Sequence, residues 1–321
     1  MNNTIQPLVS FIIPVLNGER DIARCLSALR NQKFPYEAYE VLILDNGSTD
    51  RTHQIMQDLE WKFQVVPKIG VSALRNLGAA SAQGDYLAFV DADVEIAPHW
   101  LRHGLAVFED RHVVANGCFP GIPRDATWVQ RAWDIHQRGS PKGGKLVSVP
   151  WLPSMNLIVR RDAFRSAGGF NEDLETAEDV DLCYRLGKLG TILNNPSMEA
   201  IHWGEAPDLK TFWRKEVWRG MGNLKGIFSH GLRWDEIPSL GYPLYMMCGV
   251  VLSVAGIGAA LWLRQLLLIP LSLAFLGMPA WVLALKKTYQ AKRPTAVLRL
   301  FILYLTYGFA RAFSVIKTWA R

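Results

Sequence analysis

Cysteine is scarce in this chain of 321 residues, and the few cysteines are dispersed. Disulfide frameworks and zinc sites bring cysteines together in short spacings such as CxxC. The four cysteines here lie far apart and none has that spacing, so we expect neither a disulfide framework nor a cysteine zinc site. They are Cys25, Cys118, Cys183 and Cys248.

The last quarter of the chain lacks acidic residues altogether. From Leu240 to Arg321 there are nine Lys or Arg and no Asp or Glu, whereas the preceding residues have 26 basic and 29 acidic side chains, a net charge of −3. Nucleic-acid-binding proteins usually carry their basic residues on the folded domain, so we expect no nucleic-acid partner. A basic, apolar, acid-free tail is typical of a membrane segment with positive charges on the cytoplasmic side.

Charge of either sign is missing from two long stretches of this tail. Pro243–Leu263 and Leu266–Leu285 contain no charged residue, and each is long enough to cross a hydrocarbon core of about 30 Å. We expect a transmembrane hairpin followed by a cytoplasmic Lys286–Arg293 loop; the alternative is a buried helical pair of a soluble protein. The sequence leaves open whether a third helix, about 297–316, spans the membrane or lies in its interface, because it contains two arginines.

The N-terminus has no basic segment of the kind that begins a signal peptide. Its apolar run, Leu8–Leu16, is short and contains Pro14, so we interpret it as a buried strand. We therefore expect an integral protein of the bacterial inner membrane. Its catalytic domain, residues 1–235, would lie in the cytoplasm, and residues 236–321 would form the membrane region.

Short β-branched runs alternate with amphipathic stretches in the first 200 residues. This alternation predicts an α/β fold with a mostly parallel sheet covered by helices on both faces. Such sheets bind ligands beyond the carboxyl ends of their strands. The predicted strands are Val9–Val15, Glu40–Leu44, Gln64–Val66, Tyr86–Val90 and Met155–Arg160, and the predicted helices are Arg20–Arg30, Thr49–Leu59, Val71–Ala82 and Glu178–Leu189. Residues 119–149 are expected to be irregular, with a mobile stretch at Gly139–Gly144, and this long loop is expected to be either a substrate lid or a plain surface excursion.

Carboxylates follow two of these strands. Asp91 and Asp93 come directly after the apolar run Tyr86–Val90, where both can reach one hard cation such as Mg²⁺ or Mn²⁺. Asp45 ends another strand and points toward the same edge. The residues after it have an ordinary alternative, in which Ser48 or Thr49 caps the following helix.

A second acidic pair, Glu178 and Asp179, opens a helix. Acidic residues at a helix N-terminus often only complement the helix dipole. The residues alone do not separate that role from catalysis.

Five motifs in this order resemble glycosyltransferase family 2, over roughly residues 8 to 220. They are Val9–Glu19, Leu44–Asp50, Arg75–Asn76 with Gly84–Tyr86, Asp91–Asp93, and Gly168–Phe170 with Glu178–Asp179. The resemblance implies the GT-A fold, a nucleotide-sugar donor (UDP-, GDP- or dTDP-linked), a divalent metal ion and inversion at the anomeric carbon.

The resemblance also implies roles for individual residues. Asp179 is similar to the catalytic base, with Glu178 beside it, and Arg75 to a residue near the donor phosphates. Asp45 would accept a hydrogen bond from the nucleobase. Asp91 would contact the ribose or metal, and Asp93 the metal, with His202 as a third ligand or a merely packed histidine. The remaining expected donor-binding residues are Pro14, Val15, Asn17, Glu19, Asn46 and Ser48.

One family feature is missing. Processive relatives carry a Gln-x-x-Arg-Trp motif after the base, and residues 212–220 do not match it. We therefore expect transfer of a single sugar. Residues of this stretch are expected to form an interfacial acceptor site, the alternative being a packed helix with exposed arginines; they are Trp213, Arg214, Trp218 and Arg219.

The expected membrane region, residues 236–321, would hold the active site beside the bilayer, and this suggests the class of acceptor. We expect a lipid-linked acceptor or a polysaccharide precursor. The alternatives are a polyprenyl-phosphate glycosyltransferase and, in another class, a non-catalytic nucleotide-sugar-binding membrane protein.

Overall fold

A computed structural model describes residues 6–138, 145–230 and 237–319. The chain divides into two compact units. The sheet unit comprises residues 1–124 and 142–205, and the helical unit comprises residues 125–141 and 206–321. These units are defined by compactness. The expected boundary at residue 235, between a catalytic domain and a membrane region, stays a prediction. The Gly139–Gly144 segment lies outside the described residues.

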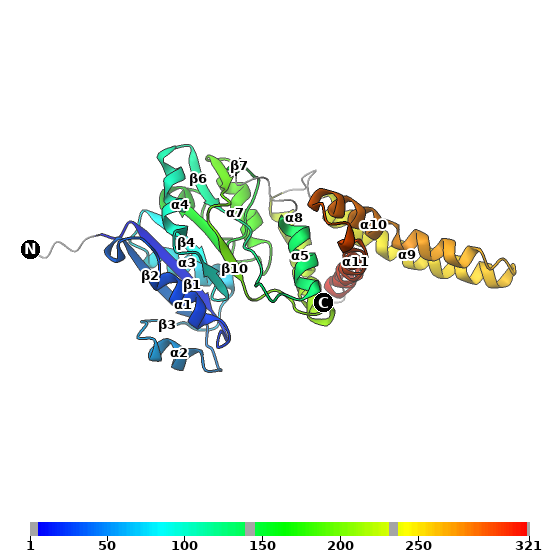
Figure 1. Ribbon diagram of the computed structural model, residues 1–321, viewed down its shortest axis with the longest axis horizontal. Helices are drawn as coiled ribbons and strands as arrows, with labels where there is room; N and C mark the ends of the chain where they lie inside the picture. The colour runs from blue at the N-terminus through cyan, green and yellow to red at the C-terminus, as the bar shows by residue number, and fades with distance from the viewer. Residues whose placement is uncertain (1–5, 139–144, 231–236, 320–321) are drawn as a thin grey trace, which may run out of the picture. The chain divides into compact units, whose positions relative to one another are not determined.

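The sheet unit contains a mixed eight-stranded sheet in the order β3-β2-β1-β4-β8-β6-β9-β7 (Figure 1). Strands β3, β2, β1 and β4 run parallel to one another, and β8 pairs antiparallel with β4 and β6. The strands are β1 Val9–Val15, β2 Tyr39–Asp45, β3 Gln64–Val65, β4 Tyr86–Val90, β6 Val113–Gly117, β7 Val147–Ser148, β8 Asn156–Arg160 and β9 Thr191–Asn194. The predicted α/β fold is confirmed.

A two-stranded antiparallel sheet accompanies the large one. It pairs β5 (Val94–Ile96) with β10 (Ala200–His202), so that His202 lies opposite Val94. This pairing brings two segments more than 100 residues apart to the end of β4.

Helices pack on both faces of the large sheet because its strands alternate their side chains between two cores. Phe11 belongs to a core that includes α1 and α4, whereas its neighbour Ile12 belongs to a core that includes α3, α6 and α7. The helices are α1 Ile22–Arg30, α2 Thr52–Asp58, α3 Val71–Ser81, α4 Trp100–Ala106, α6 Arg161–Ser166 and α7 Glu178–Leu186.

Residues 119–149 are not irregular throughout, as the sequence had suggested. They contain α5, Trp128–Arg138, which buries Val129, Ala132 and Trp133 in the core of the helical unit. Thr127 and Gln130 form a capping box, in which each side chain bonds the backbone N–H of the other. The Gly and Pro residues on both sides of α5 had obscured this start signal.

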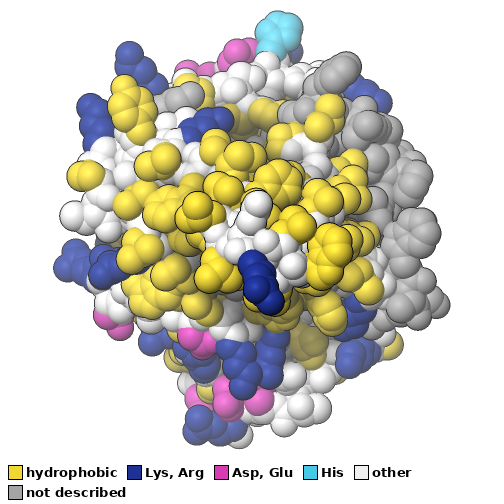
Figure 2. All heavy atoms as spheres, turned by 90° about the vertical axis from the view of Figure 1, so that its right-hand side faces the viewer, with side chains coloured by type: hydrophobic (Ala, Val, Ile, Leu, Met, Phe, Trp, Pro, Cys, Tyr) yellow, Lys and Arg dark blue, Asp and Glu magenta, His cyan; other side chains and the backbone are white. Residues whose placement is uncertain are grey.

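The helical unit also contains α8 Leu209–His230, α9 Ile237–Trp262, α10 Leu268–Ala291 and α11 Val297–Trp319. Helices α9 and α10, and residues 294–318 including α11, are long and apolar enough to cross a membrane. Large apolar side chains of α9 and α10, such as Val251 and Leu271, are exposed, and Figure 2 shows yellow hydrophobic side chains over much of that face. Such a face is typical of contact with lipid.

A buried ion network joins α8 to α11. The Glu216 carboxylate is fully buried and accepts hydrogen bonds from Arg219 Nη1 at 2.6 Å and Arg311 Nη2 at 2.8 Å. Gly220 allows the close approach, since a Cβ there would lie 2.2 Å from Ser314 Oγ. Arg311, which interrupts the apolar pattern of α11, is therefore explained by its partner on α8.

We predict that Glu216→Gln destabilises the helical unit. The substitution keeps the shape but removes the carboxylate charge between two guanidinium groups, and breaking a buried ion pair costs about 3–5 kcal/mol. Thermal unfolding of the full chain in detergent should shift to clearly lower temperature. The exposed Glu175→Gln is the control, and an equal melting temperature for both variants would refute the prediction.

Candidate active site

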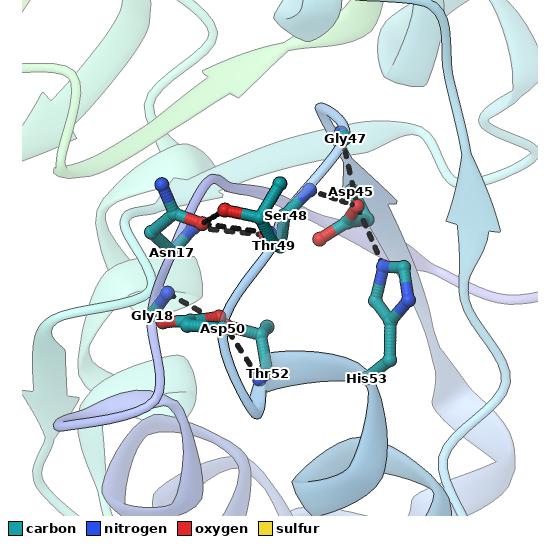
Figure 3. Close-up of polar contacts among 9 residues, drawn as sticks. All are labelled: Asn17, Gly18, Asp45, Gly47, Ser48, Thr49, Asp50, Thr52 and His53. Atoms are coloured by element: carbon teal, nitrogen blue, oxygen red, sulfur yellow. Dashed lines mark hydrogen bonds and ion pairs between the residues drawn. The ribbon is translucent and has the colours of Figure 1, made fainter.

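The parallel register of β1, β2 and β4 brings their carboxyl ends to one edge of the sheet, as Val15 pairs with Asp45. The loops that follow β1 and β2 are bonded to each other (Figure 3). Asn17 N–H donates to Ser48 Oγ at 2.8 Å, and its side-chain oxygen accepts from Thr49 N–H at 2.9 Å. Glu19 accepts from Arg51 in the same way. Pro14 and Val15 are buried in β1 itself.

Ser48 and Thr49 do not cap α2 as the alternative suggested. Helix α2 begins at Thr52, and the Asp50 carboxylate accepts from its N–H at 3.0 Å. Ser48 and Thr49 instead form hydrogen bonds with the loop after β1. They therefore hold the two loops at this edge of the sheet together and do not stabilise the start of the helix. Asn46 is also a scaffold residue here, since its amide bonds both backbone groups of Ile69 at 2.9 Å.

Asp45 is fully buried, and its two oxygens have different surroundings. Oδ1 accepts from the N–H groups of Gly47 and Ser48 at 3.0 and 2.9 Å, and lies 2.8 Å from His53 Nε2. Oδ2 is buried without a hydrogen-bond partner in the described part of the chain. Burial opposes ionisation, but the hydrogen bonds from Ser48 and His53 hold the pKa of Asp45 below its ordinary value. The group is therefore an ionised acceptor with one oxygen to spare.

Arg75, on α3, is buried between two carboxylates. Its Nη2 lies 2.7 Å from Asp91 Oδ1, and its Nη1 lies 2.8 Å from Glu178 Oε1. Burial alone would lower the pKa of Arg75, but the two carboxylates raise it, so the guanidinium stays charged. The sequence placed Arg75 near phosphates. The structure gives it the further role of joining the end of β4 to the start of α7.

Asp179 follows Glu178 at the start of α7. Ala177, just before this pair, has a left-handed backbone with φ of 63°, which is strained for a residue with a side chain. Burial and the neighbouring Glu178 carboxylate raise the pKa of Asp179 from 3.8 to about 7, although Arg75 acts against this. A carboxylate with such a pKa suits proton transfer near neutral pH.

Asp93 and His202 face each other across the small sheet. Asp93 Oδ2 lies 3.2 Å from His202 Nε2, and Glu205 Oε1 lies 3.2 Å from His202 Nδ1. Burial would lower the pKa of His202, but Asp93 and Glu205 together raise it to about 10. Sequence reasoning missed Glu205, and the available signal for it is its spacing of three residues from His202.

These residues fit a divalent cation that displaces the proton of His202, because a histidine binds a metal ion only as neutral imidazole. An aspartate oxygen and a histidine nitrogen that converge are a usual donor set, and a second carboxylate behind the histidine is the usual support of a metal ligand. Gly204 is required beside them, since a Cβ there would lie 1.9 Å from Asp93 Oδ2. Among the described residues no three His, Cys, Asp or Glu side chains form a metal cluster. A cation here would therefore need further oxygen ligands, such as substrate phosphates and water.

The expected acceptor residues lie on α8 in the helical unit. Arg214 and Trp218 are exposed, and Trp213 packs near Phe313. Arg219 belongs to the buried network around Glu216 and lies over the Trp133 ring. Arg214 and Trp218 are therefore accessible to an acceptor, whereas Arg219 stabilises the helical unit.

The fold and this arrangement of carboxylates define a glycosyltransferase of the GT-A type. The model of the family described as "Glycosyl transferase family 2" matches residues 10–168, and the chain belongs to this family. The mannosyltransferase PcManGT from Pyrobaculum calidifontis, solved with GDP-Man and Mn²⁺, has a similar fold. Its TM-score is 0.61 at 18% identity, over 98% of this chain and 88% of that one.

Two curated relatives are similar in sequence. The probable glycosyltransferase YdaM of Bacillus subtilis is 26% identical over 94% of this chain and 80% of its own length. The β-monoglucosyldiacylglycerol synthase of a Nostoc species is 30% identical over 56% of this chain, but the match spans only 41% of that enzyme.

We predict that Gly204→Ala impairs metal binding. The added Cβ must displace Asp93 or His202, and disturbing the surroundings of a metal ligand typically lowers affinity by roughly 10–100-fold. Calorimetric titration of Mn²⁺ in the presence of a nucleoside diphosphate measures the effect. Gly187→Ala, where the nearest atom to the new Cβ lies at 3.3 Å, is the control. Equal Mn²⁺ affinity in the two variants would show that this glycine does not protect a metal site.

Proposed function

We propose that the protein transfers a single sugar from a nucleotide-sugar donor to a lipid-linked acceptor, with inversion and with the help of a divalent metal ion. The observation that carries the proposal is the pair Asp93 and His202, backed by Glu205, beside the Arg75-linked carboxylates. The proposal is supported because these residues, which would serve as cation ligands and base, belong to the same compact unit. UDP-, GDP- or dTDP-sugars are the donors considered.

Asp93 and His202 would hold Mg²⁺ or Mn²⁺, with Asp91 close by in the chain. The bound ion would stabilise the negative charge that develops on the departing diphosphate. Asp91 is already bonded to Arg75 through Oδ1. Its other oxygen would contact the ribose or the ion.

Asp179 would accept the proton of the acceptor hydroxyl. The hydroxyl oxygen then attacks the anomeric carbon while the bond from that carbon to the phosphate oxygen breaks, and its electron pair leaves with the diphosphate. A single displacement of this kind inverts the anomeric centre. Glu178 would support the step indirectly, because its carboxylate adds to the effect of burial in raising the pKa of Asp179.

A lipid-linked acceptor is favoured by the helical unit. Its three apolar helices are long enough to span a membrane, and α8 begins only four residues after Glu205. The relative from Nostoc is named for a glucosylated diacylglycerol. We infer that the protein is anchored in the bacterial inner membrane, with the sheet unit and the Lys286–Arg293 loop in the cytoplasm.

The proposal is tested by assaying nucleotide sugars with membrane lipid extracts, in the presence of Mn²⁺ and then of excess chelator. Metal-dependent glycolipid formation is expected. Undiminished transfer after chelation would contradict the metal requirement, and donor binding without any transfer would favour the non-catalytic alternative.

Asp179→Asn should lower transfer to a hydroxyl acceptor by roughly 10²–10⁴-fold, because the amide cannot take a proton. Donor affinity should change little. The exposed Asp173→Asn, in the segment before α7, is the control. Near-normal transfer by Asp179→Asn would show that Asp179 is not the base and that it only complements the dipole of α7. A small loss with a polyprenyl phosphate, which has no hydroxyl proton to remove, would favour that acceptor instead.

The pH profile provides an independent readout of the same residue. Only the deprotonated form of Asp179 can act as base, so kcat/KM of the wild type should fall as the pH drops through about 7. This acid limb should be missing from the residual activity of Asp179→Asn. An unchanged acid limb in the variant would assign the titration to another group.

Membrane topology is tested by cysteine labelling. Cys248 is the exposed native cysteine, whereas the other three are buried, so Cys248→Ser provides the background. In it, Arg264→Cys should react with an impermeant maleimide only from the non-cytoplasmic side, and the control Lys286→Cys only from the cytoplasmic side. Labelling of both from the cytoplasmic side would exclude the hairpin.

A further inference from the structure

Two histidines at the start of α4 form a pair that the proposed mechanism does not use. His99 and His103 are both exposed, and the N–H of His103 donates to the carbonyl oxygen of His99 at 3.0 Å, so the two residues lie one helical turn apart. Their imidazole rings are neighbours, with centroids 6.0 Å apart and planes inclined by 38°. Two histidines with this spacing can bind one metal ion together.

A backbone carbonyl determines which nitrogen of His103 is available to a metal ion. His103 Nδ1 lies 2.8 Å from the carbonyl oxygen of Ser197. Since a carbonyl oxygen only accepts, Nδ1 carries the proton of the neutral imidazole and Nε2 keeps its lone pair. Asn195 fastens the two segments, because its side chain donates to the carbonyl oxygen of His103 and accepts from the N–H of Ser197, both at 3.1 Å. Metal-binding histidines are usually oriented by a hydrogen bond of this kind from the second ring nitrogen.

The backbone beneath the pair is held in place by buried groups. Trp100, the first residue of α4, is fully buried, and its Nε1–H donates to Asn156 Oδ1 at 2.6 Å. The side chain of Gln32 accepts from the N–H of Leu101 at 3.1 Å and donates to the carbonyl oxygen of Ala97 at 2.8 Å. The two histidines therefore stand on a fixed support, which reduces the entropy lost when a ligand binds.

The separation of the rings suits a transition-metal ion. With metal–nitrogen bonds of about 2.0–2.1 Å, two imidazoles on one tetrahedral ion have centroids roughly 5 Å apart. A small rotation of the exposed side chains would close the observed pair on one ion. Imidazole nitrogen suits Zn²⁺, Ni²⁺ and Cu²⁺, whereas Mg²⁺ and Mn²⁺ prefer oxygen ligands. No metal-binding group of three His, Cys, Asp or Glu occurs in residues 6–138, 145–230 and 237–319, so water would supply the other ligands.

We propose that His99 and His103 form a surface site for a late first-row divalent ion, Zn²⁺, Ni²⁺ or Cu²⁺, bound through both imidazoles. This site is separate from the candidate cation site at Asp93 and His202, since strand β5 lies between Asp93 and His99 in the chain. It also favours a different class of ion, and it does not depend on the proposed function.

The test is calorimetric titration of Ni²⁺ into the full chain in detergent at pH 8, purified without a histidine tag. The wild type should bind Ni²⁺ at this pair. His99→Gln and His103→Gln should each weaken that binding by at least about 10-fold, because the remaining imidazole must hold the ion alone. His112→Gln removes another exposed histidine and is the control. Equal Ni²⁺ binding by all three variants would overturn the proposal.

The double variant His103→Gln/Ala106→His separates the spacing of the histidines from their number. Ala106 is exposed at the end of α4. The exchange keeps two histidines on the helix but sets them about 10 Å apart along its axis, too far to share one ion. The affinity for Ni²⁺ should match that of His103→Gln, and wild-type affinity would overturn the pair as the site.

Mn²⁺-dependent binding of UDP reports on the other candidate site in the same samples. It should be the same in His99→Gln as in the wild type, and its loss in that variant would contradict a separate site. His202→Gln should leave Ni²⁺ binding at the α4 pair unchanged. Absence of Mn²⁺-dependent UDP binding in the wild type would count against the proposed function while the Ni²⁺ titrations still decide this inference.

Discussion

The site depends on the two ion pairs that the buried guanidinium of Arg75 forms with Asp91 and Glu178. Asp91, Asp93, Glu178 and Asp179 bring four carboxylates toward one edge of the sheet, and carboxylates in such surroundings repel one another. Arg75, on α3, lies between Asp91 and Glu178, and neither of these residues belongs to α3. It joins the end of β4 to the start of α7. A buried ion pair adds little stability by itself, so its value lies in fixing where these groups stand.

In the proposed mechanism, this arrangement gives the carboxylates different tasks. Asp91, with one oxygen bonded to Arg75, and Asp93, facing His202, lie on the side suited to a cation. Asp179 lies on the other side of the Arg75 bridge, where burial and Glu178 keep its pKa raised. In the proposed mechanism, Asp91 and Asp93 would take part in donor activation and Asp179 in proton removal.

The sequence predicted what depends on local pattern. Alternating apolar runs located β1, β2 and β4 because their period reflects burial on two faces, and the uncharged stretches located α9 and α10. The position of Asp91 after a buried strand was likewise visible. Helix α5 was missed, although the residues of its capping box, Thr127 and Gln130, are recognisable in the sequence.

Contacts between distant segments were not predictable in this way. Arg75 and Glu178 are 103 residues apart, and Asp93 and His202 are 109 apart. Their pairing is set by the order of the strands and by the small sheet of β5 and β10, which a single sequence does not encode in any local signal. The supporting residues Glu205 and His53 escaped notice for the same reason, since each acts only through a residue that the fold places beside it.

The central claim is that this edge binds a divalent ion and a nucleotide together. Anomalous diffraction from crystals grown with Mn²⁺ and UDP measures the position of the ion directly. The account predicts a manganese peak within coordination distance of the Asp93 carboxylate and His202 Nε2, with the diphosphate completing its ligands. A bound nucleotide with manganese elsewhere, or with no manganese at Asp93, would contradict it.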